Sequence, residues 1–369
     1  NMKLLQTDRD ALLTPLQAVT GIVEKRHTLP ILSNVLIERK LDALTLLATD
    51  LEIQISTQCE ASGNTEPKSL TVSARKLQDI LRSLPEGADT TLDLQSGKVQ
   101  IKASKSRFNL QTMPAEDFPK MAEPGAALAT ISISQKQFKD LLLLVQYAMA
   151  QQDIRYYLNG LLLVVDGNKI KVVATDGHRL SYADGELADP QEKREVILPR
   201  KAVLELSRQL SSTDDTLDIS IYAAQVRFHY GRSELVTKII DGKFPDYTRV
   251  IPVSYGNTIT LDCQVLLGSL QRAAILSNEK YRGVRWTLSS NSLKISCTNT
   301  EQEEAQEELE VGYDGEPLDV GFNITYLLDV LNNVHTETIH CSFGDANSSM
   351  LITIPQRDDF RYVVMPMRI

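Results

Sequence analysis

A short segment around His178 contains the residue types that acid and base chemistry requires. Residues 174–179 read Ala-Thr-Asp-Gly-His-Arg, so a turn there would place the side chains of Asp176, His178 and Arg179 close together. No serine or cysteine nucleophile motif accompanies them, and Asp50 occupies the matching place in a related segment that no histidine follows. An enzyme that uses these three side chains is therefore the alternative hypothesis, and a non-catalytic protein is the leading one.

Other sites of catalysis or metal binding lack their usual sequence patterns. The motifs G-x-x-x-x-G-K-[ST], G-x-G-x-x-G, G-x-S-x-G and H-E-x-x-H do not occur. His335, His340 and Cys341 do not have the spacing of a helical metal pair or a zinc finger, and the four cysteines include no C-x-x-C pair. We therefore expect no metal, no cofactor and reduced, buried thiols.

An acidic run lies near the C-terminal end of the sequence. Residues 301–308 read Glu-Gln-Glu-Glu-Ala-Gln-Glu-Glu, without the central glycine and the aspartates of a calcium loop. Two interpretations remain open for it. The run is either a solvated edge or one half of a charge-complementary interface.

The elements that carry these residues recur three times along the chain. Residues 44–50 (Leu-Thr-Leu-Leu-Ala-Thr-Asp) return as 170–176 (Ile-Lys-Val-Val-Ala-Thr-Asp) and as 293–299 (Leu-Lys-Ile-Ser-Cys-Thr-Asn). These intervals are too long for a solenoid and fit whole domains. With the breaks at Pro124-Gly125 and at residues 252–257, the sequence predicts three similar domains, 1–126, 127–255 and 256–369.

Each repeat has the pattern of an α+β unit. One helix is expected upstream of each repeated strand, at residues 10–25, 135–151 and 264–279, and Pro15 should confine or kink the first. A second helix should open near Ala74, Pro199 and Asn323. Alternation of apolar and polar residues predicts half-buried antiparallel strands at 91–95, 99–102, 109–112 and 218–221.

Charge is distributed unevenly between the helices and the rest of the chain. The net charge of −9 and the pI near 5.2 would, taken alone, argue against a nucleic-acid partner. The six expected helices nevertheless carry 13 basic and 7 acidic residues, or +6, while the remainder carries −15. A solvated helix face is the usual explanation for any one charged helix, but all of the helices except the last are net basic, which is harder to explain in that way and leaves an anionic partner open. The windows counted are 9–26, 74–84, 135–152, 199–210, 264–280 and 323–334.

No segment predicts a membrane anchor. The chain has no run of 18 or more apolar residues, and no basic and apolar leader precedes Lys3. We therefore expect a cytoplasmic protein without a membrane partner.

Six segments resemble one known family, the bacterial DNA polymerase III beta subunits, which are the sliding clamps of the replicase. The resemblance covers essentially the whole chain. It rests on residues 28–32 (Thr-Leu-Pro-Ile-Leu), 153–160 (Asp-Ile-Arg-Tyr-Tyr-Leu-Asn-Gly), 174–180, 244–247 (Phe-Pro-Asp-Tyr), 272–280 (Arg-Ala-Ala-Ile-Leu-Ser-Asn-Glu-Lys) and 362–368 (Tyr-Val-Val-Met-Pro-Met-Arg).

The resemblance implies a DNA-clamp fold and a ring. Two chains would join head to tail into a homodimer, with sheets outside and helices lining a central channel around duplex DNA. Twelve helices at ~9 Å per neighbour give a ring ~34 Å across the helix axes and ~24 Å clear, whereas one chain alone would leave only ~7 Å. A duplex therefore requires the dimer, and its contacts should be weak, sensitive to salt and independent of sequence.

The resemblance also implies three groups of site residues and no catalysis. DNA would be contacted by Arg26, Arg75, Gln152, Tyr156, Tyr157, Arg200 and Lys201, although the two tyrosines could instead be half-buried strand aromatics. A pocket for short linear motifs would use Leu158, Thr175, Gly177, His178, Arg179, Leu180, Pro245, Arg249, Val250, Ser349, Val363, Val364, Met365, Pro366, Met367 and Arg368. The dimer interface would use Lys76, Lys105, Arg107, Phe108, Leu110, Ile275, Leu276, Glu301, Glu303 and Glu304.

In that pocket, methionines would adapt to leucine or phenylalanine anchors, and Arg179 and Arg368 at the rim would meet acidic groups. The implied partners are the replicative polymerase alpha subunit, the clamp loader, other DNA polymerases, mismatch repair proteins and ligase. The chain departs from the family at Ala150, where histidine is frequent, and at Glu24, whose carboxylate would weaken DNA contact at Arg26. A three-domain scaffold unrelated to DNA is the remaining alternative.

Overall fold

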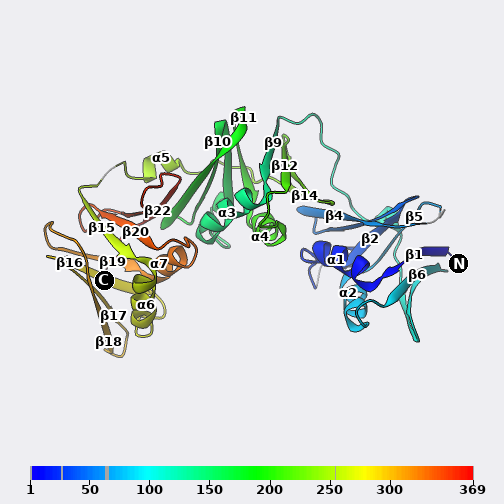
Figure 1. Cartoon of the computed structure of the whole chain (residues 1–369), viewed down its shortest axis with the longest axis horizontal. Helices are drawn as coiled ribbons and strands as arrows, with labels where there is room; N and C mark the ends of the chain where they lie inside the picture. The colour runs from blue at the N-terminus through cyan, green and yellow to red at the C-terminus, as the bar shows by residue number, and fades with distance from the viewer. Residues whose placement is uncertain (1, 26–27, 63–65, 254, 369) are drawn as a thin grey trace. The chain divides into compact units, whose positions relative to one another are not determined.

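The computed structural model describes residues 2–25, 28–62, 66–253 and 255–368, and the strands within them form four antiparallel sheets (Figure 1). The chain divides into two compact units. Residues 1–136 and 205–239 make up the first unit, and residues 137–204 and 240–369 make up the second.

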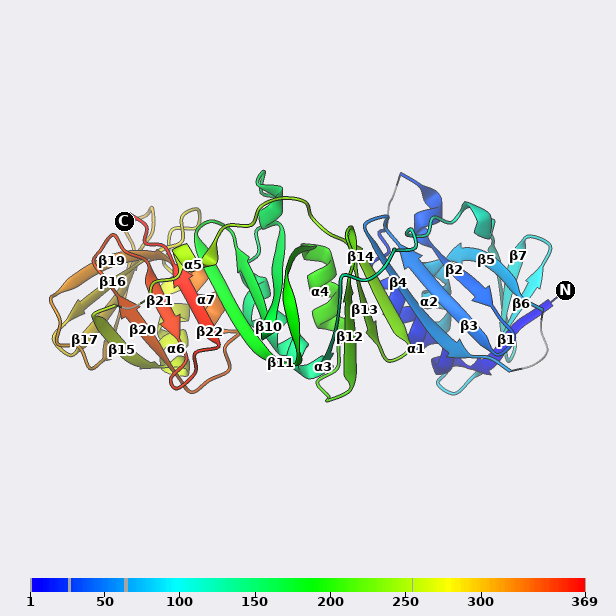
Figure 2. The ribbon, with the colours of Figure 1, turned by 90° about the horizontal axis from the view of Figure 1, so that it is seen from above.

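The first unit contains an eight-stranded sheet and a four-stranded sheet, whose strands lie side by side in Figure 2. The larger sheet has the order β5-β2-β3-β4-β14-β13-β12-β9. Its strands are β2 (Asn34–Arg39), β3 (Ala43–Thr49), β4 (Ile53–Glu60), β5 (Lys68–Ser73), β9 (Ala129–Ser134), β12 (Thr216–Ile221), β13 (Gln225–Tyr230) and β14 (Ser233–Lys238). The smaller sheet has the order β1 (Met2–Asp8), β6 (Asp89–Gln95), β7 (Lys98–Ala103) and β8 (Ser106–Gln111).

Two helices pack against each other in this unit, α1 (Arg9–Thr20) and α2 (Ala74–Ser83). The Asp8 side chain caps α1 by accepting from the Asp10 amide, and Ser73 caps α2 by accepting from the Lys76 amide. The expected start of α2 near Ala74 is confirmed. Helix α1 continues past Pro15 to Thr20, so the proline does not confine it. Short 3₁₀ turns η1 (Pro30–Ser33) and η2 (Ala115–Asp117) complete the unit.

The second unit contains a six-stranded and a four-stranded sheet. The larger sheet has the order β10 (Gly160–Thr175), β11 (Arg179–Pro199), β22 (Phe360–Val364), β21 (Met350–Thr353), β20 (Thr338–Phe343) and β15 (Asn257–Asp262). The smaller sheet has the order β18 (Glu304–Glu310), β17 (Ser292–Thr298), β16 (Gly283–Ser289) and β19 (Leu318–Asn323). Each predicted alternating segment lies in a strand, except that Thr112 follows the end of β8, and each repeated segment lies in a strand up to its last residue, which belongs to the following turn.

Helices of the second unit begin where the sequence indicates but end earlier. Helix α6 (Cys263–Ala274) is capped by Asp262 and packs beside α7 (Ile324–Leu331), which Asn323 caps. The helix expected to reach residue 279 stops because the amides of Ile275 and Leu276 turn back to form tighter i−3 bonds. The short helix α5 (Tyr247–Val250) and the turn η4 (Tyr156–Leu158) lie in long connections.

Two helices each contain a point along the chain at which one unit gives way to the other. Helix α3 (Gln135–Val145) is followed by the 3₁₀ turn η3 (Gln146–Ala148), so the helix expected to reach residue 151 is shorter. Helix α4 (Arg200–Gln209) opens one residue after Pro199, close to its predicted start.

The repeats join edge to edge through antiparallel strand pairs. In the first unit β4 of the first repeat pairs with β14 of the second, and in the second unit β11 of the second repeat pairs with β22 of the third. Adjacent repeats therefore share continuous sheets. Each pairing also satisfies backbone groups that would otherwise lie on exposed edges.

The four cysteines are unpaired and buried. No helix among the described residues is long and apolar enough to cross a membrane.

Candidate functional site

The candidate site is built around the turn between β10 and β11. The Thr175 hydroxyl donates to the Arg179 carbonyl at 2.7 Å and accepts from the Gly177 amide at 3.1 Å. The Asp176 carboxylate accepts the amides of His178 and Arg179 at 2.9 and 3.1 Å. Gly177 adopts a φ of +91°, which favours glycine. Four short contacts therefore hold this turn in one conformation.

The same turn recurs in the first repeat. The Thr49 hydroxyl donates to the Ile53 carbonyl and accepts from the Leu51 amide, while Asp50 accepts the amides of Glu52 and Ile53. Leu51 takes the positive φ, 81°, that Gly177 takes in the second repeat. The aspartate of this motif is thus a backbone-capping residue of the repeat.

The structure does not support the alternative of catalysis at His178. The Asp176 carboxylate binds turn amides and the Arg179 Nε atom, at 3.0 Å, instead of orienting the imidazole. His178 is exposed, and its ring stacks on Tyr326 with centroids 6.4 Å apart. A general base needs a partner that orients it, and the Asp176 carboxylate does not serve as one.

A closed loop from Ala150 to Asn159 lies beside the turn. The Ala150 amide donates to the Leu158 carbonyl at 3.0 Å, and the Asn159 side chain bonds the backbone of Asp153 in both directions. Arg155 forms an ion pair with Asp153 at 3.0 Å, and its guanidinium lies where a Cβ on Gly177 would stand 3.0 Å away. The loop therefore brings a half-exposed arginine over the turn.

Helix α5 and strand β22 complete the enclosure. Leu180 pairs with Val363 across the β11–β22 ladder, and the Met365 amide donates to the His178 carbonyl at 3.0 Å. Val250 of α5 packs against the same apolar cluster as Leu158 and Val363. The third repeat thereby supplies one wall, and the second repeat supplies the others.

These elements surround a cavity of about 210 Å³. Its lining is mostly apolar, with two arginines. The lining residues are Arg155, Tyr157, Leu158, Thr175, Gly177, Arg179, Leu180, Pro245, Val250, Val363 and Met365. Typical sites for drug-sized ligands are larger, ~300–1,000 Å³, so this cavity suits one or two apolar side chains of a bound peptide.

The charge of Arg179 is not available at the rim, which corrects the expectation. Its side chain is only 7% exposed and forms ion pairs with Asp176 at 3.0 Å and with Asp329 at 3.1 Å. Arg155, which was not expected in the pocket, has a 47% exposed side chain. The feature of the sequence that could have indicated Arg155 is its position next to Tyr156 and Tyr157, which are assigned to DNA contact.

The end of the chain divides between two hollows, contrary to the expectation of one Met-Pro-Met wall. Met365 lines the 210 Å³ cavity, but the Met367 amide bonds the Gly321 carbonyl at 2.8 Å, at the edge of β19. Met367 and Arg368 line a separate hollow of about 670 Å³ with Tyr281 and Arg285. The β19 contact explains the separation, because it draws the tail away from β22.

Five other residues assigned to the pocket do not line the cavity. Val364 is fully buried in β22, and Arg249 is highly exposed on α5, where it pairs with Asp246 at 3.5 Å. The remaining three are His178, Ser349 and Pro366.

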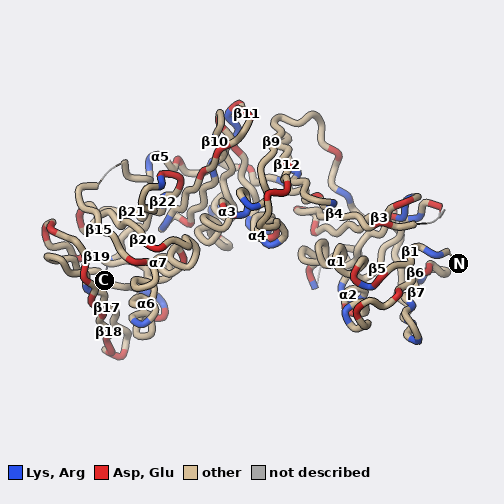
Figure 3. Tube along the Cα trace, viewed as in Figure 1, with Lys and Arg blue, Asp and Glu red and all other residues tan. Residues whose placement is uncertain are grey.

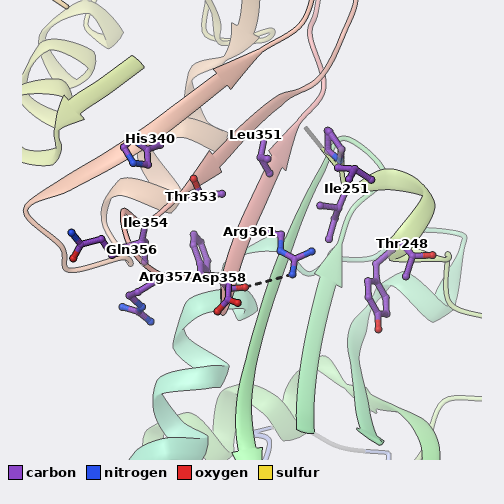
Figure 4. A pocket seen from close by; sticks show the side chains of 14 residues that line it. Thr248, Ile251, His340, Leu351, Thr353, Ile354, Gln356, Arg357, Asp358 and Arg361 are labelled. Atoms are coloured by element: carbon purple, nitrogen blue, oxygen red, sulfur yellow. Dashed lines mark hydrogen bonds between the residues drawn. The ribbon is translucent and has the colours of Figure 1, made fainter. Parts of the chain in front are cut away.

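A third hollow, of about 810 Å³, lies beside α5 (Figure 4). Ile251, Leu351 and Ile354 line it together with Arg357 and Arg361. Arg361 donates to the Asp358 carbonyl at 3.5 Å. None of the residues assigned to a site from the sequence lines this hollow.

The residues assigned to DNA fall in both units. Arg75 belongs to the first unit, where it donates to the Val23 carbonyl at 2.6 Å. In the second unit Gln152 and Tyr156 are exposed on the loop, and the Arg200 amide bonds the Asn159 carbonyl at its base. The others in this group are Lys201, which is half-buried on α4, Tyr157, which lines the cavity, and Arg26, which lies outside the described residues.

The residues assigned to a dimer interface form two surfaces, one in each unit. In the first unit Lys105 and Arg107 are exposed, and Phe108 and Leu110 are half-buried on the edge strand β8, while Lys76 is exposed on α2. In the second unit Ile275 is 78% exposed and Leu276 half-buried after α6, near the edge strand β18. Glu301, Glu303 and Glu304 are exposed there. Figure 3 shows basic residues at the β7–β8 hairpin and acidic residues along β18.

No group of three or more metal-binding side chains occurs in the described parts of the chain. Repeated α+β units with an apolar, peptide-sized cavity and opposite charges on two edge strands define a binding protein that assembles with others.

Comparisons with known proteins identify the family. Three models match in succession: the DNA polymerase III beta subunit N-terminal domain at residues 2–122, its central domain at 132–246 and its C-terminal domain at 248–368. The chain therefore belongs to the DNA polymerase III beta subunit family, the sliding clamps, which are non-catalytic processivity subunits.

Relatives and solved structures agree over nearly the full length. The beta sliding clamp of Pseudomonas aeruginosa is 46% identical over 362 residues, 98% of each chain, and that of Escherichia coli is 41% identical over 98% of this chain and 99% of its own. A P. aeruginosa sliding clamp crystallised with ligand matches with a TM-score of 0.96 and 45% identity, covering 100% of both chains. A P. aeruginosa clamp bound to griselimycin matches equally well, and the Caulobacter crescentus clamp matches with a TM-score of 0.94 at 38% identity.

Proposed function

We propose that two copies of this chain close head to tail into a ring that encircles duplex DNA and tethers a polymerase to it. The match to all three clamp domains along one chain is the observation that carries the proposal. In this proposal the domains are residues 1–126, 127–255 and 256–369, and their helices line the channel. The site of action is the cytoplasm, where replication takes place.

The ring joint in this proposal forms between two edge strands. Strand β8 ends one sheet and carries Arg107, and strand β18 ends another and carries Glu304. Edge strands expose unpaired backbone groups, so β8 of one copy and β18 of the next can extend one sheet across the joint. Because the joint is head to tail, its two faces carry opposite charges without needing to match themselves.

DNA contact in this proposal is sparse and independent of sequence. Gln152 and Tyr156 are exposed on the loop before β10, and Arg200 and Lys201 open the adjacent helix α4. Arg75 makes the corresponding contact from the first domain, and Arg26 belongs to the same group. A few flexible contacts to phosphates hold the duplex but let it slide, because no base edge is recognised.

The 210 Å³ cavity binds short linear motifs in this proposal. Apolar anchors enter between Leu180, Val250 and Met365, and carboxylate groups meet the exposed Arg155. The flexible methionine at the mouth allows different anchors to fit. The partners are the replicative polymerase alpha subunit, the clamp loader, other DNA polymerases, mismatch repair proteins and ligase.

The test is topological retention on DNA. Clamp loaded onto a nicked circle should remain bound after salt is raised, and should leave quickly once the circle is cut to give free ends. Blocking both ends of the linear DNA with bound protein should restore retention. Equally rapid loss from circular, linear and blocked DNA would rule out an encircling ring.

A further inference from the structure

The side chain of Arg179 forms hydrogen bonds with four other residues. Its Nε donates to Asp176 at 3.0 Å, and its Nη1 donates to Asp329 and to the Tyr362 hydroxyl at 3.1 Å each. Its Nη2 donates to the Tyr147 carbonyl at 2.9 Å. These bonds use four of the five N–H groups of an arginine.

The contacts of Arg179 come from four separate elements. Asp176 belongs to the β10–β11 turn, Tyr147 to η3, Asp329 to α7 and Tyr362 to β22. The guanidinium also lies 4.5 Å from the ring centroid of Tyr326 on α7. A cation bound to the second and third repeats at once restrains the distance between them.

Those elements carry neighbouring parts of the cavity lining. Thr175, Gly177 and Leu180 line it from the turn and the start of β11, and Val363 and Met365 line it from the neighbouring β22 and the segment that follows. Arg179 stands at the junction, since it pairs with Val364 in the β11–β22 ladder.

We propose that Arg179 is a positioning residue that holds the β10–β11 turn and the segment after β22 in place against α7 through Asp176, Asp329 and Tyr362. Only the expected effects on peptide binding rest on the function proposed above. A bound carboxylate meets Arg155, while the polar groups of Arg179 are bound within the protein, so Arg179 affects binding by positioning the other lining residues. Withdrawing Arg179 toward a ligand would leave two partly buried carboxylates without their cation, which is strongly unfavourable.

A test without ligand comes first, by hydrogen–deuterium exchange of the full-length protein. The Met365 amide is held by the His178 carbonyl, so exchange in the segment 362–367 reports on the junction. Arg179→Gln and Asp329→Asn should both speed exchange there, while the control Arg232→Gln, at an exposed arginine of the first unit that pairs with Glu60, leaves it unchanged. Unchanged exchange in Arg179→Gln would overturn the proposal whatever the protein binds.

A thermodynamic cycle then separates positioning from direct contact. The probes are an acetylated pentapeptide that ends in leucine and phenylalanine with a free carboxylate, and its C-terminal amide. Arg179→Gln should weaken both probes by the same factor, about tenfold. Arg155→Gln should weaken the acid more than the amide.

Asp329→Asn gives opposite outcomes under the two roles and keeps the arginine in place. Asp329 is a third exposed, so the variant should fold. Positioning predicts weaker binding of both probes by one factor, because a support of the guanidinium is lost. Direct contact predicts unchanged or tighter binding of the acid, because the guanidinium gains freedom, and that result would overturn the proposal. Failure of the wild-type protein to bind either probe would instead count against the function proposed for the cavity, and the exchange experiment would still decide the role of Arg179.

Discussion

At the scale of single residues, one turn explains most of the recurring sequence. Thr49-Asp50 and Thr175-Asp176 close equivalent turns through the same hydroxyl and carboxylate bonds. Asn299 accepts the amides of Glu301 and Glu303 in the third repeat, which extends the pattern. The residues that resemble an acid–base site therefore fix the conformation of a turn. The binding site is formed by the elements that surround this turn in the second repeat.

Replacing Gly177 with alanine should separate stability from binding. The positive φ should cost about 1 kcal/mol of folding free energy, and the new Cβ, 3.0 Å from the Arg155 guanidinium, should displace that side chain. We expect weaker peptide binding by titration calorimetry. Gly97→Ala is the control, because its φ is +75° with no atom within 4 Å, and it should lose similar stability with unchanged binding. Equal binding by both variants would contradict the role of Arg155.

The buried thiols should make stability fall at alkaline pH. Burial raises the pKa of Cys59, Cys263 and Cys297 to about 11. A raised thiol pKa favours the neutral form in the folded state, so stability is intact below the ordinary thiol pKa and declines as pH rises toward 11. The guanidinium chloride concentration at the midpoint of unfolding should decrease between pH 8 and pH 10. The decrease should be smaller in Cys59→Ala. Buried tyrosines titrate in the same direction, so only this difference isolates the thiol.

At the scale of elements, capping side chains account for the helix starts. Asp262 accepts from the Val265 amide at 3.0 Å, and Asn323 accepts from the Thr325 amide at 2.9 Å. Helix ends lack such a local signal: α6 finishes at Ala274 because the following amides tighten into i−3 bonds above the ladder of β17 and β18. A start depends on the chain next to it, and an end depends on what the helix packs against.

Removing the cap of α6 should destabilise the second unit. Asp262→Ala should lower the free energy of unfolding by about 1 kcal/mol, because an amide of the first turn loses its acceptor. Asp262→Asn should retain most of the stability, since its carbonyl oxygen can still accept. Urea denaturation followed by the fluorescence of Trp286, which lies in β16 of this unit, measures both variants. A loss as large in Asp262→Asn would show that charge, not capping, is responsible.

At the scale of the whole molecule, assembly should depend on the apolar residues that follow α6. Ile275 is 78% exposed in one chain, which suits a residue covered by a partner. Replacing both Ile275 and Leu276 with alanine should convert dimer to monomer, because two large side chains can contribute several kcal/mol at a joint. Sedimentation velocity measures the mass. Val265→Ala is the control, since Val265 is also exposed on α6 and should remain dimeric.

Charge complementarity at the same joint can be tested by swapping the charges of the two edge strands. Arg107→Glu should weaken the dimer by placing acidic groups on both edge strands, and adding Glu304→Arg should restore much of the association. In Arg107→Glu, added salt should strengthen the dimer, because it screens the new repulsion between the two acidic strands. If the double variant is no tighter than Arg107→Glu alone, the two strands do not meet as proposed.

The sequence by itself determined the features that depend on neighbouring residues. The threefold repeat, the alternating strands, the capped helix starts and the Thr-Asp turns all follow from local spacing and hydrogen bonding. The family could also be inferred from its motifs, and the domain matches bear it out. A reader of the sequence could name nine of the residues that line the cavity.

Only the tertiary structure decided how the charges around the cavity are used. The β11–β22 pairing brings Asp329 and Tyr362 to Arg179, more than a hundred residues away along the chain, and so buries a cation expected at the rim. It leaves Arg155 as the exposed cation. The β19 contact of Met367 removes the end of the tail from the cavity. Long-range pairing chooses the partners of a side chain, and those partners determine whether its charge supports the fold or meets a ligand.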